Sequence, residues 1–66
     1  MNITLNGNNK SLQKKSSVLD LLKDLQLTPE TVVVELNTTI IQPDSYDSTD
    51  IGEGDQVEII RFVGGG

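Results

Sequence analysis

The chain has 66 residues, of which 35% are hydrophobic, and a formal net charge of −5 from ten acidic and five basic residues. A chain of this length forms one small domain, which buries only about 60% of its unfolded surface. Cysteine and histidine are absent, which excludes disulfides, thiolate metal sites, cysteine nucleophiles and the commonest general base. The negative charge argues against nucleic acid as a partner. It suits a basic partner surface, or it serves solubility alone.

The first element expected is a β-hairpin. Residues 2–6 alternate between polar and apolar side chains, the period of a half-buried strand. Asn6-Gly7 follows, and this dipeptide is the strongest short signal for a hairpin turn. We expect the return strand over residues 10–14, with Leu12 in the core and the strand at the edge of a sheet.

A helix is expected next. Ser16 and Ser17 offer an N-cap, and Asp20 in the first turn favours the positive end of the helix dipole. Apolar residues at the spacing i, i+3, i+4 and i+7 form one stripe: Val18, Leu21, Leu22 and Leu25. The helix must end before Pro29, because the residue preceding a proline is disfavoured in the α region.

The second half of the chain predicts a short strand pair and a longer final strand. Residues 32–36 begin with three β-branched valines and predict a strand, with Val32, Val34 and Leu36 on one face. A turn then leads to a short strand at residues 40–41, and residues 43–46 form a helical turn or a loop. After the turn at residues 52–55, the last strand runs over residues 56–63 in a central position of the sheet. The expected fold is α+β, a mixed sheet of four to five strands with one helix packed across one face.

The carboxylates give no convincing catalytic or metal site. Asp44, Asp47 and Asp50 recur at a spacing of three, but an EF-hand loop also needs a glycine at its sixth position and a glutamate at its twelfth. The glycines at 52 and 54 lack the lysine and the helix of a phosphate-binding loop. We therefore expect no catalytic side chain, no metal ion and no bound cofactor.

The last strand predicts an exposed apolar patch. Alternation assigns Val57 and Ile59 to the core, so that Glu58, Ile60 and Phe62 point away from the helix. Exposed apolar patches often mark protein contacts, and we expect these three residues to bind a partner. The alternatives are scattered surface hydrophobic residues, or a patch that the loop at residues 43–52 covers.

The sequence ends in Gly64-Gly65-Gly66, a run without side chains that could pack in a core. One interpretation is a slim arm whose terminal carboxylate is the reacting group, since residues without a Cβ can enter a narrow active site. The other is a frayed end or a cloning scar. We expect one domain over residues 1–63 and a flexible tail over residues 64–66. No apolar run reaches the roughly 20 residues of a membrane span, and no signal peptide follows Met1, so we expect a cytoplasmic protein without a membrane partner.

These features together resemble the sulfur carrier family of thiamine biosynthesis, called ThiS. The resemblance covers the whole chain in length and element order. It is most specific in the Gly-Asp-Gln-Val-Glu-Ile segment at residues 54–59 and in the terminal Phe-Val-Gly-Gly-Gly at residues 62–66. Membership implies the ubiquitin-like β-grasp fold and a carrier protein that is not itself an enzyme.

The resemblance also implies a mechanism. A partner related to ubiquitin-activating enzymes uses ATP and Mg²⁺ to adenylate the Gly66 carboxylate. Sulfur from a cysteine desulfurase then converts it to a thiocarboxylate, which thiazole synthase consumes to build the thiazole ring. Gly64 and Gly65 give access to both partners. The alternatives are the small subunit of molybdopterin synthase, whose proline-containing approach to Gly-Gly is missing here, a ubiquitin-like modifier, and a binding module with an inert tail.

Overall fold

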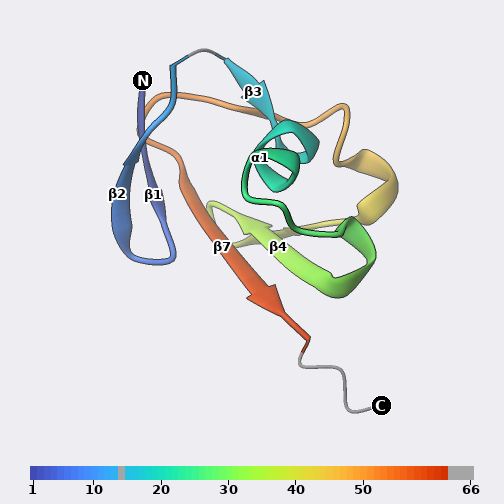
Figure 1. Cartoon of the computed structure of the whole chain (residues 1–66). Coiled ribbons are helices and arrows are strands. Elements are labelled where there is room, and N and C mark those ends of the chain that lie inside the picture. Colours follow the sequence, from blue (N-terminus) through green and yellow to red (C-terminus); the bar gives the residue numbers. More distant parts are fainter. Residues whose placement is uncertain (14, 63–66) are drawn as a thin grey trace.

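The computed structural model describes residues 1–13 and 15–62. In chain order the elements are β1 (Asn2–Leu5), β2 (Asn8–Ser11), β3 (Ser16–Ser17), α1 (Val18–Asp24), the 3-10 turn η1 (Pro29–Thr31), β4 (Val32–Leu36), β5 (Thr39–Ile41), the 3-10 turn η2 (Pro43–Ser45), β6 (Asp50–Ile51) and β7 (Gln56–Arg61). Figure 1 shows these elements, with α1 packed over β4 and β7. Within the described ranges no helix has the length and apolar character needed to cross a membrane.

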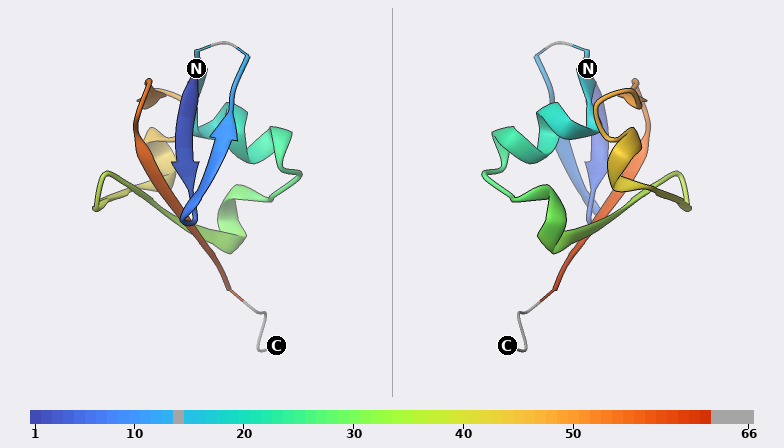
Figure 2. Two further views of the ribbon diagram at one scale, coloured as in Figure 1. Left: turned by 90° about the vertical axis from the view of Figure 1, so that its left-hand side faces the viewer. Right: turned by 90° about the vertical axis from the view of Figure 1, so that its right-hand side faces the viewer.

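Five strands form a mixed sheet in the order β2-β1-β7-β4-β5. β7 lies parallel to β1 and antiparallel to β4, while β1–β2 and β4–β5 are antiparallel hairpins. The prediction of a mixed sheet with a central last strand is therefore confirmed. In both views of Figure 2, β7 runs from the β1–β2 hairpin to the far end of the described molecule.

One face of the sheet packs on the helix and carries the core. Val34 and Leu22 are fully buried, and the burial of each such side chain contributes about 1.5–3 kcal/mol. The core consists of Ile3, Leu12, Val18, Leu21, Leu22, Val32, Val34, Tyr46, Ile51, Val57 and Ile59. The stripe predicted on the helix is buried at its first three positions, and Leu25 is half-buried.

The helix begins at the predicted N-cap and ends before Pro29, as predicted. Ser17 is the N-cap: its Oγ accepts the N–H of Asp20, and the Asp20 carboxylate accepts the N–H of Ser17, both at 3.1 Å. At the other end Gln26 adopts φ 59°, and the N–H of Leu27 donates to Leu22 O at 2.9 Å. This is a Schellman motif with glutamine at the left-handed position. The helix therefore ends at Asp24, well before Pro29.

Other details differ from the sequence-based expectation. The last strand, β7, ends at Arg61 rather than at residue 63. β2 covers Asn8–Ser11 rather than residues 10–14, because the turn consists of Asn6 and Gly7 alone; Leu12 is nevertheless buried. In addition, β3 and β6 form a small two-stranded sheet that no pattern indicated. This second sheet joins the start of α1 to the segment before β7.

Candidate functional site

The side chains of β7 lie on the buried and exposed faces that the sequence predicted. Val57 and Ile59 are 1% and 9% exposed, whereas Ile60 and Phe62 are 53% and 58% exposed, and Glu58 is also exposed. The loop after β5 does not cover this outer face. It packs on the helix side instead, where Tyr46 is buried in the core and its carbonyl accepts the N–H of Leu19 at 2.9 Å.

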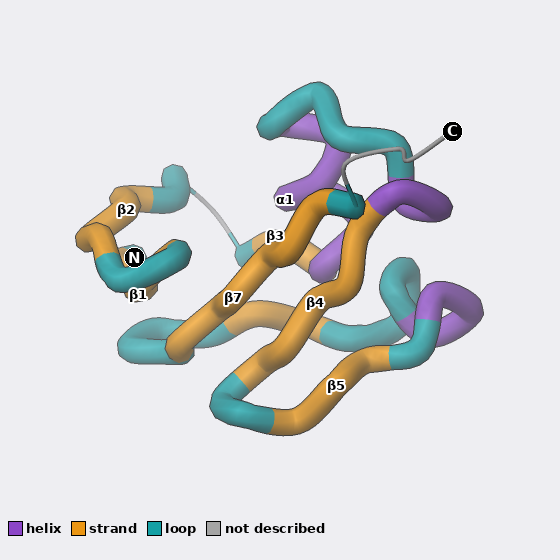
Figure 3. Tube along the Cα trace, turned by 90° about the horizontal axis from the view of Figure 1, so that it is seen from below, coloured by secondary structure: helices purple, strands orange, loops and turns teal. Residues whose placement is uncertain are grey.

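The neighbouring strands enlarge the apolar surface. Val33 of β4 lies directly opposite Ile60, and Ile40 of β5 is 58% exposed on the same side of the sheet. Figure 3 views this face, with β7, β4 and β5 side by side and α1 behind them. We call these four residues the sheet-face patch: Val33, Ile40, Ile60 and Phe62. A shallow groove of about 260 Å³ opens at its edge, between Phe62, Ile40 and Pro43.

Sequence reasoning missed Ile40. Alternation along residues 40–41 leaves open which of the two isoleucines faces the core, since a slip of one residue reverses both. The pairing of Ile40 with Glu35 and of Ile41 with Val34 resolves this, because Val34 is buried on the helix side. The turn geometry at Asn37 and Thr38, both with positive φ, sets that register.

The chain segment that leads to the tail remains hydrogen-bonded to the sheet as far as Phe62. The N–H of Phe62 donates to Thr31 O at 2.9 Å, so the β4–β7 pairing continues one residue beyond β7. The tail residues named by the sequence, Gly64, Gly65 and Gly66, lie outside the described residues. Phe62 is therefore both the last residue of the sheet-face patch and the last described residue before the tail.

Two polar side chains of the described residues, Tyr46 and Asp55, have structural roles. Burial raises the pKa of the Tyr46 phenol above its ordinary value of 10.0, so the group stays protonated near neutral pH. The Asp55 carboxylate is engaged in a turn, where it accepts the N–H of Gly52 at 2.7 Å and the Nδ2–H of Asn37 at 3.1 Å. Across residues 1–13 and 15–62, no three acidic or metal-ligating side chains are grouped closely enough to hold a metal ion.

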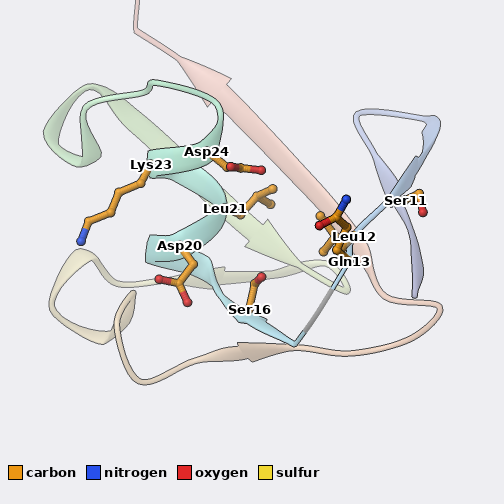
Figure 4. A pocket seen from close by; sticks show the side chains of 8 residues that line it. All are labelled: Ser11, Leu12, Gln13, Ser16, Asp20, Leu21, Lys23 and Asp24. Carbon is orange, nitrogen blue, oxygen red and sulfur yellow. The ribbon is translucent and has the colours of Figure 1, made fainter.

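A larger open hollow, of about 790 Å³, lies on the helix side between the end of β2 and α1. Figure 4 shows Leu12 and Leu21 facing each other across it, with Ser16 and Asp20 at its rim. Both leucines belong to the core. The hollow is therefore the open seam between hairpin and helix, on the opposite face of the sheet from the sheet-face patch.

The chain matches one protein family and is similar to several individual proteins. Residues 3–66 match the ThiS family. The sulfur carrier protein ThiS of Bacillus subtilis is 37% identical over 65 residues, which cover 97% of this chain and 98% of that protein. A thiazole synthase of Magnetococcus marinus is 35% identical over 66 residues, but the chain spans only 20% of its length.

A solved structure agrees with these sequence matches. The crystal structure of the thiamine biosynthesis protein (ThiS) of Geobacter metallireducens superposes with a TM-score of 0.86 at 36% identity, and all of both chains is covered. The likeness confirms the predicted ubiquitin-like β-grasp fold. By sequence and by structure, the chain belongs to the ThiS family.

Proposed function

We propose that this chain is a sulfur carrier of thiamine biosynthesis whose Gly66 carboxylate is adenylated, converted to a thiocarboxylate and used to make the thiazole ring. The carrier role itself follows from membership of the ThiS family. The chemistry at Gly66 is the proposed part. The observation that carries it is the exposed sheet-face patch, which continues along β7 to Phe62, four residues before Gly66.

The chemistry requires activation because a carboxylate is a poor electrophile. In the partner's active site a Gly66 carboxylate oxygen attacks the α-phosphorus of ATP, and Mg²⁺-bound pyrophosphate leaves. A persulfide sulfur then attacks the acyl carbon and displaces AMP. A thiol cleaves the resulting S–S bond, which leaves the thiocarboxylate on Gly66 and a disulfide on the sulfur donor. ATP and Mg²⁺ belong to the partner, and the carrier contributes only its terminal carbonyl carbon.

Three partners follow from this scheme. An adenylyltransferase related to ubiquitin-activating enzymes activates Gly66, a cysteine desulfurase supplies the sulfur indirectly, and thiazole synthase consumes it. The similarity to a segment of thiazole synthases supports the last of these. Ile60, Phe62 and Glu58 contact the partners, while Gly64 and Gly65 provide the slim approach. The chain acts as a co-substrate rather than as an enzyme, in the cytoplasm.

The test is the intact mass of the chain after incubation with the adenylyltransferase, ATP, Mg²⁺ and a persulfide donor. The expected product is heavier by the exchange of one oxygen for sulfur, whereas a protein modifier yields much larger adducts. Deletion of Gly66 withdraws the carboxylate by roughly 3.5 Å, and misplacement by about 1 Å can cost on the order of 100-fold. An alanine appended after Gly66 places a Cβ at the reacting residue.

Both tail variants should abolish ATP–pyrophosphate exchange while their circular dichroism stays that of the wild type. Equal exchange by the wild type and both variants would show that the tail is an inert end.

A further inference from the structure

The outer face of the sheet is divided into an apolar half and a polar half. The apolar half is the sheet-face patch on β7, β4 and β5. The other half lies on β1, β2 and the start of β7, where Thr4 pairs with Asn9 on one side and with Gln56 on the other. A partner that buries apolar surface therefore covers the half nearest Phe62.

Two carboxylates interrupt the apolar half. Glu35 on β4 and Glu58 on β7 are direct cross-strand partners, and Ile40 is the partner of Glu35 on its other side. Directly opposite residues of antiparallel strands have Cβ atoms about 5 Å apart, and like charges at such positions destabilise a sheet. The sheet therefore carries an unfavourable pair at the centre of its exposed face.

The described part of the chain does not neutralise this pair. Within residues 1–13 and 15–62, no lysine or arginine forms a salt bridge with either glutamate. Arg61 belongs to the other face of the sheet, because it pairs with the buried Val32. After Lys23 the sequence contains nine acidic residues and Arg61 as its one basic residue. None of the described residues supplies a complementary cation to the two glutamates, and a partner protein can supply one.

We infer that the sheet-face patch docks the adenylyltransferase through an arginine that inserts between Glu35 and Glu58, flanked by apolar side chains that cover Ile40 and Ile60. This inference rests on the proposed function for the identity of the partner. A guanidinium suits the position because its planar fork of donors can bind two carboxylates at once and packs well against apolar surface. Local rules of stability are most often violated at functional sites, and the facing glutamates are such a violation.

The inference predicts opposite effects on folding and on binding. Replacing both glutamates (Glu35→Gln with Glu58→Gln) removes the repulsion between the two carboxylates and, at the same time, the binding site for the partner's cation. The melting temperature should rise, while the Kd for the purified adenylyltransferase, measured by titration calorimetry, should increase at least tenfold. The dependence of Kd on salt should also become weaker, because the charged contact is lost.

A matched pair of variants tests the extent of the patch. Ile40→Glu and Thr39→Glu alter neighbouring exposed residues of β5 that point to opposite faces of the sheet. Ile40→Glu should weaken binding at least tenfold, and Thr39→Glu should change it less than threefold. Ile40→Ser removes the apolar contact without adding charge and should weaken binding in the same direction.

Three results would overturn the inference: unchanged binding by the double glutamine variant, a fall in its melting temperature, or equal losses for the two β5 variants. If the wild type still loads sulfur on Gly66, such a result rejects the docking mode alone. If the wild type neither binds the adenylyltransferase nor gains sulfur, the proposed function fails and the inference fails with it.

Discussion

The side chain of Asn6 takes the place of a strand neighbour for Ile59: its Oδ1 accepts the Ile59 N–H at 2.8 Å across 53 residues of sequence. β1 pairs with β7 through Thr4 and Leu5, and the chain then reverses at the hairpin turn. The N–H of Asn6 also donates to Val57 O at 2.9 Å. One turn residue thus holds the middle of the strand that carries the sheet-face patch.

Asn6→Gly should therefore destabilise the protein by about 1 kcal/mol. Glycine accommodates the positive φ of 49° at this position, so the substitution adds no backbone strain. The loss of stability then reports the missing Oδ1 acceptor, which leaves the part-buried N–H of Ile59 unpaired. Asn6→Asp keeps a carboxylate oxygen as acceptor and should cost at most about 0.5 kcal/mol. Urea denaturation measures both, and equal losses would mean that the hydrogen bond to Ile59 contributes nothing.

Sequence patterns predicted the hairpin, the helix N-cap and the side chains of β7 that face the core, because each of these features depends on residues close together in the chain. Asn6-Gly7 encodes its own turn, and the Ser17–Asp20 capping box spans three positions. The alternation of Val57 with Glu58 needs only the period of a strand. Local chemistry was sufficient in these cases.

The features that the sequence missed depend on tertiary placement. The hydrogen bond from Ile59 to Asn6 and the β3–β6 pairing join segments more than 30 residues apart, and no local pattern marks them. Ile40 became part of the candidate site only through the register of β5. The family resemblance, rather than any local pattern, named Gly66 as the reacting residue, and its chemistry stays a prediction.

Gln26→Gly should stabilise the protein by about 0.5–1 kcal/mol. Gln26 occupies the left-handed position of the Schellman motif with φ 59°, where a side chain costs about 1–2 kcal/mol. Glycine removes that cost but loses more entropy on folding, so the net gain is smaller. Thermal denaturation followed at the helix band of the circular dichroism spectrum provides the measurement.

Gln42→Gly is the matched control. Gln42 has φ −71° and ψ 145°, an ordinary extended conformation, so glycine brings only its entropic cost there. This variant should be destabilised by about 0.5–1 kcal/mol. A stability change of the same sign in both variants would contradict the assignment of strain to Gln26.

Ile60→Glu and Ile59→Glu should separate binding from folding at adjacent positions of β7. Ile60 is 53% exposed, and a surface substitution there should change stability by no more than about 0.5 kcal/mol. Loss of an interface hot spot can nevertheless cost about 2 kcal/mol of binding or more. Adenylation by the partner should therefore fall while the melting temperature stays nearly constant.

Ile59 is 9% exposed and belongs to the core, so Ile59→Glu should cost at least about 2 kcal/mol and unfold much of this small domain. Circular dichroism and pyrophosphate exchange distinguish the two outcomes. Unfolding of Ile60→Glu would contradict the exposed position of Ile60, and normal adenylation of that variant would remove it from the partner interface.

The simultaneous changes Asp44→Asn, Asp47→Asn and Asp50→Asn should leave sulfur loading largely intact. The reacting carbon belongs to Gly66 in our proposal, and these carboxylates lie in and after η2, on the segment that packs on the helix side of the sheet. Asp50 forms a salt bridge with Lys15 at 3.3 Å, but both side chains are mostly exposed. Solvent screens such a pair, and its loss should cost less than about 1 kcal/mol.

Asp55→Ala provides the contrast, since this carboxylate accepts hydrogen bonds from Gly52 and from Asn37. The variant should lose about 1–3 kcal/mol of stability, yet the fraction that remains folded should still accept sulfur. The measurement is the intact mass after loading, normalised to the folded fraction by circular dichroism. A folded triple variant that fails to gain sulfur would show that the acidic segment takes part in the reaction, and it would overturn the assignment of the chemistry to the terminal glycine alone.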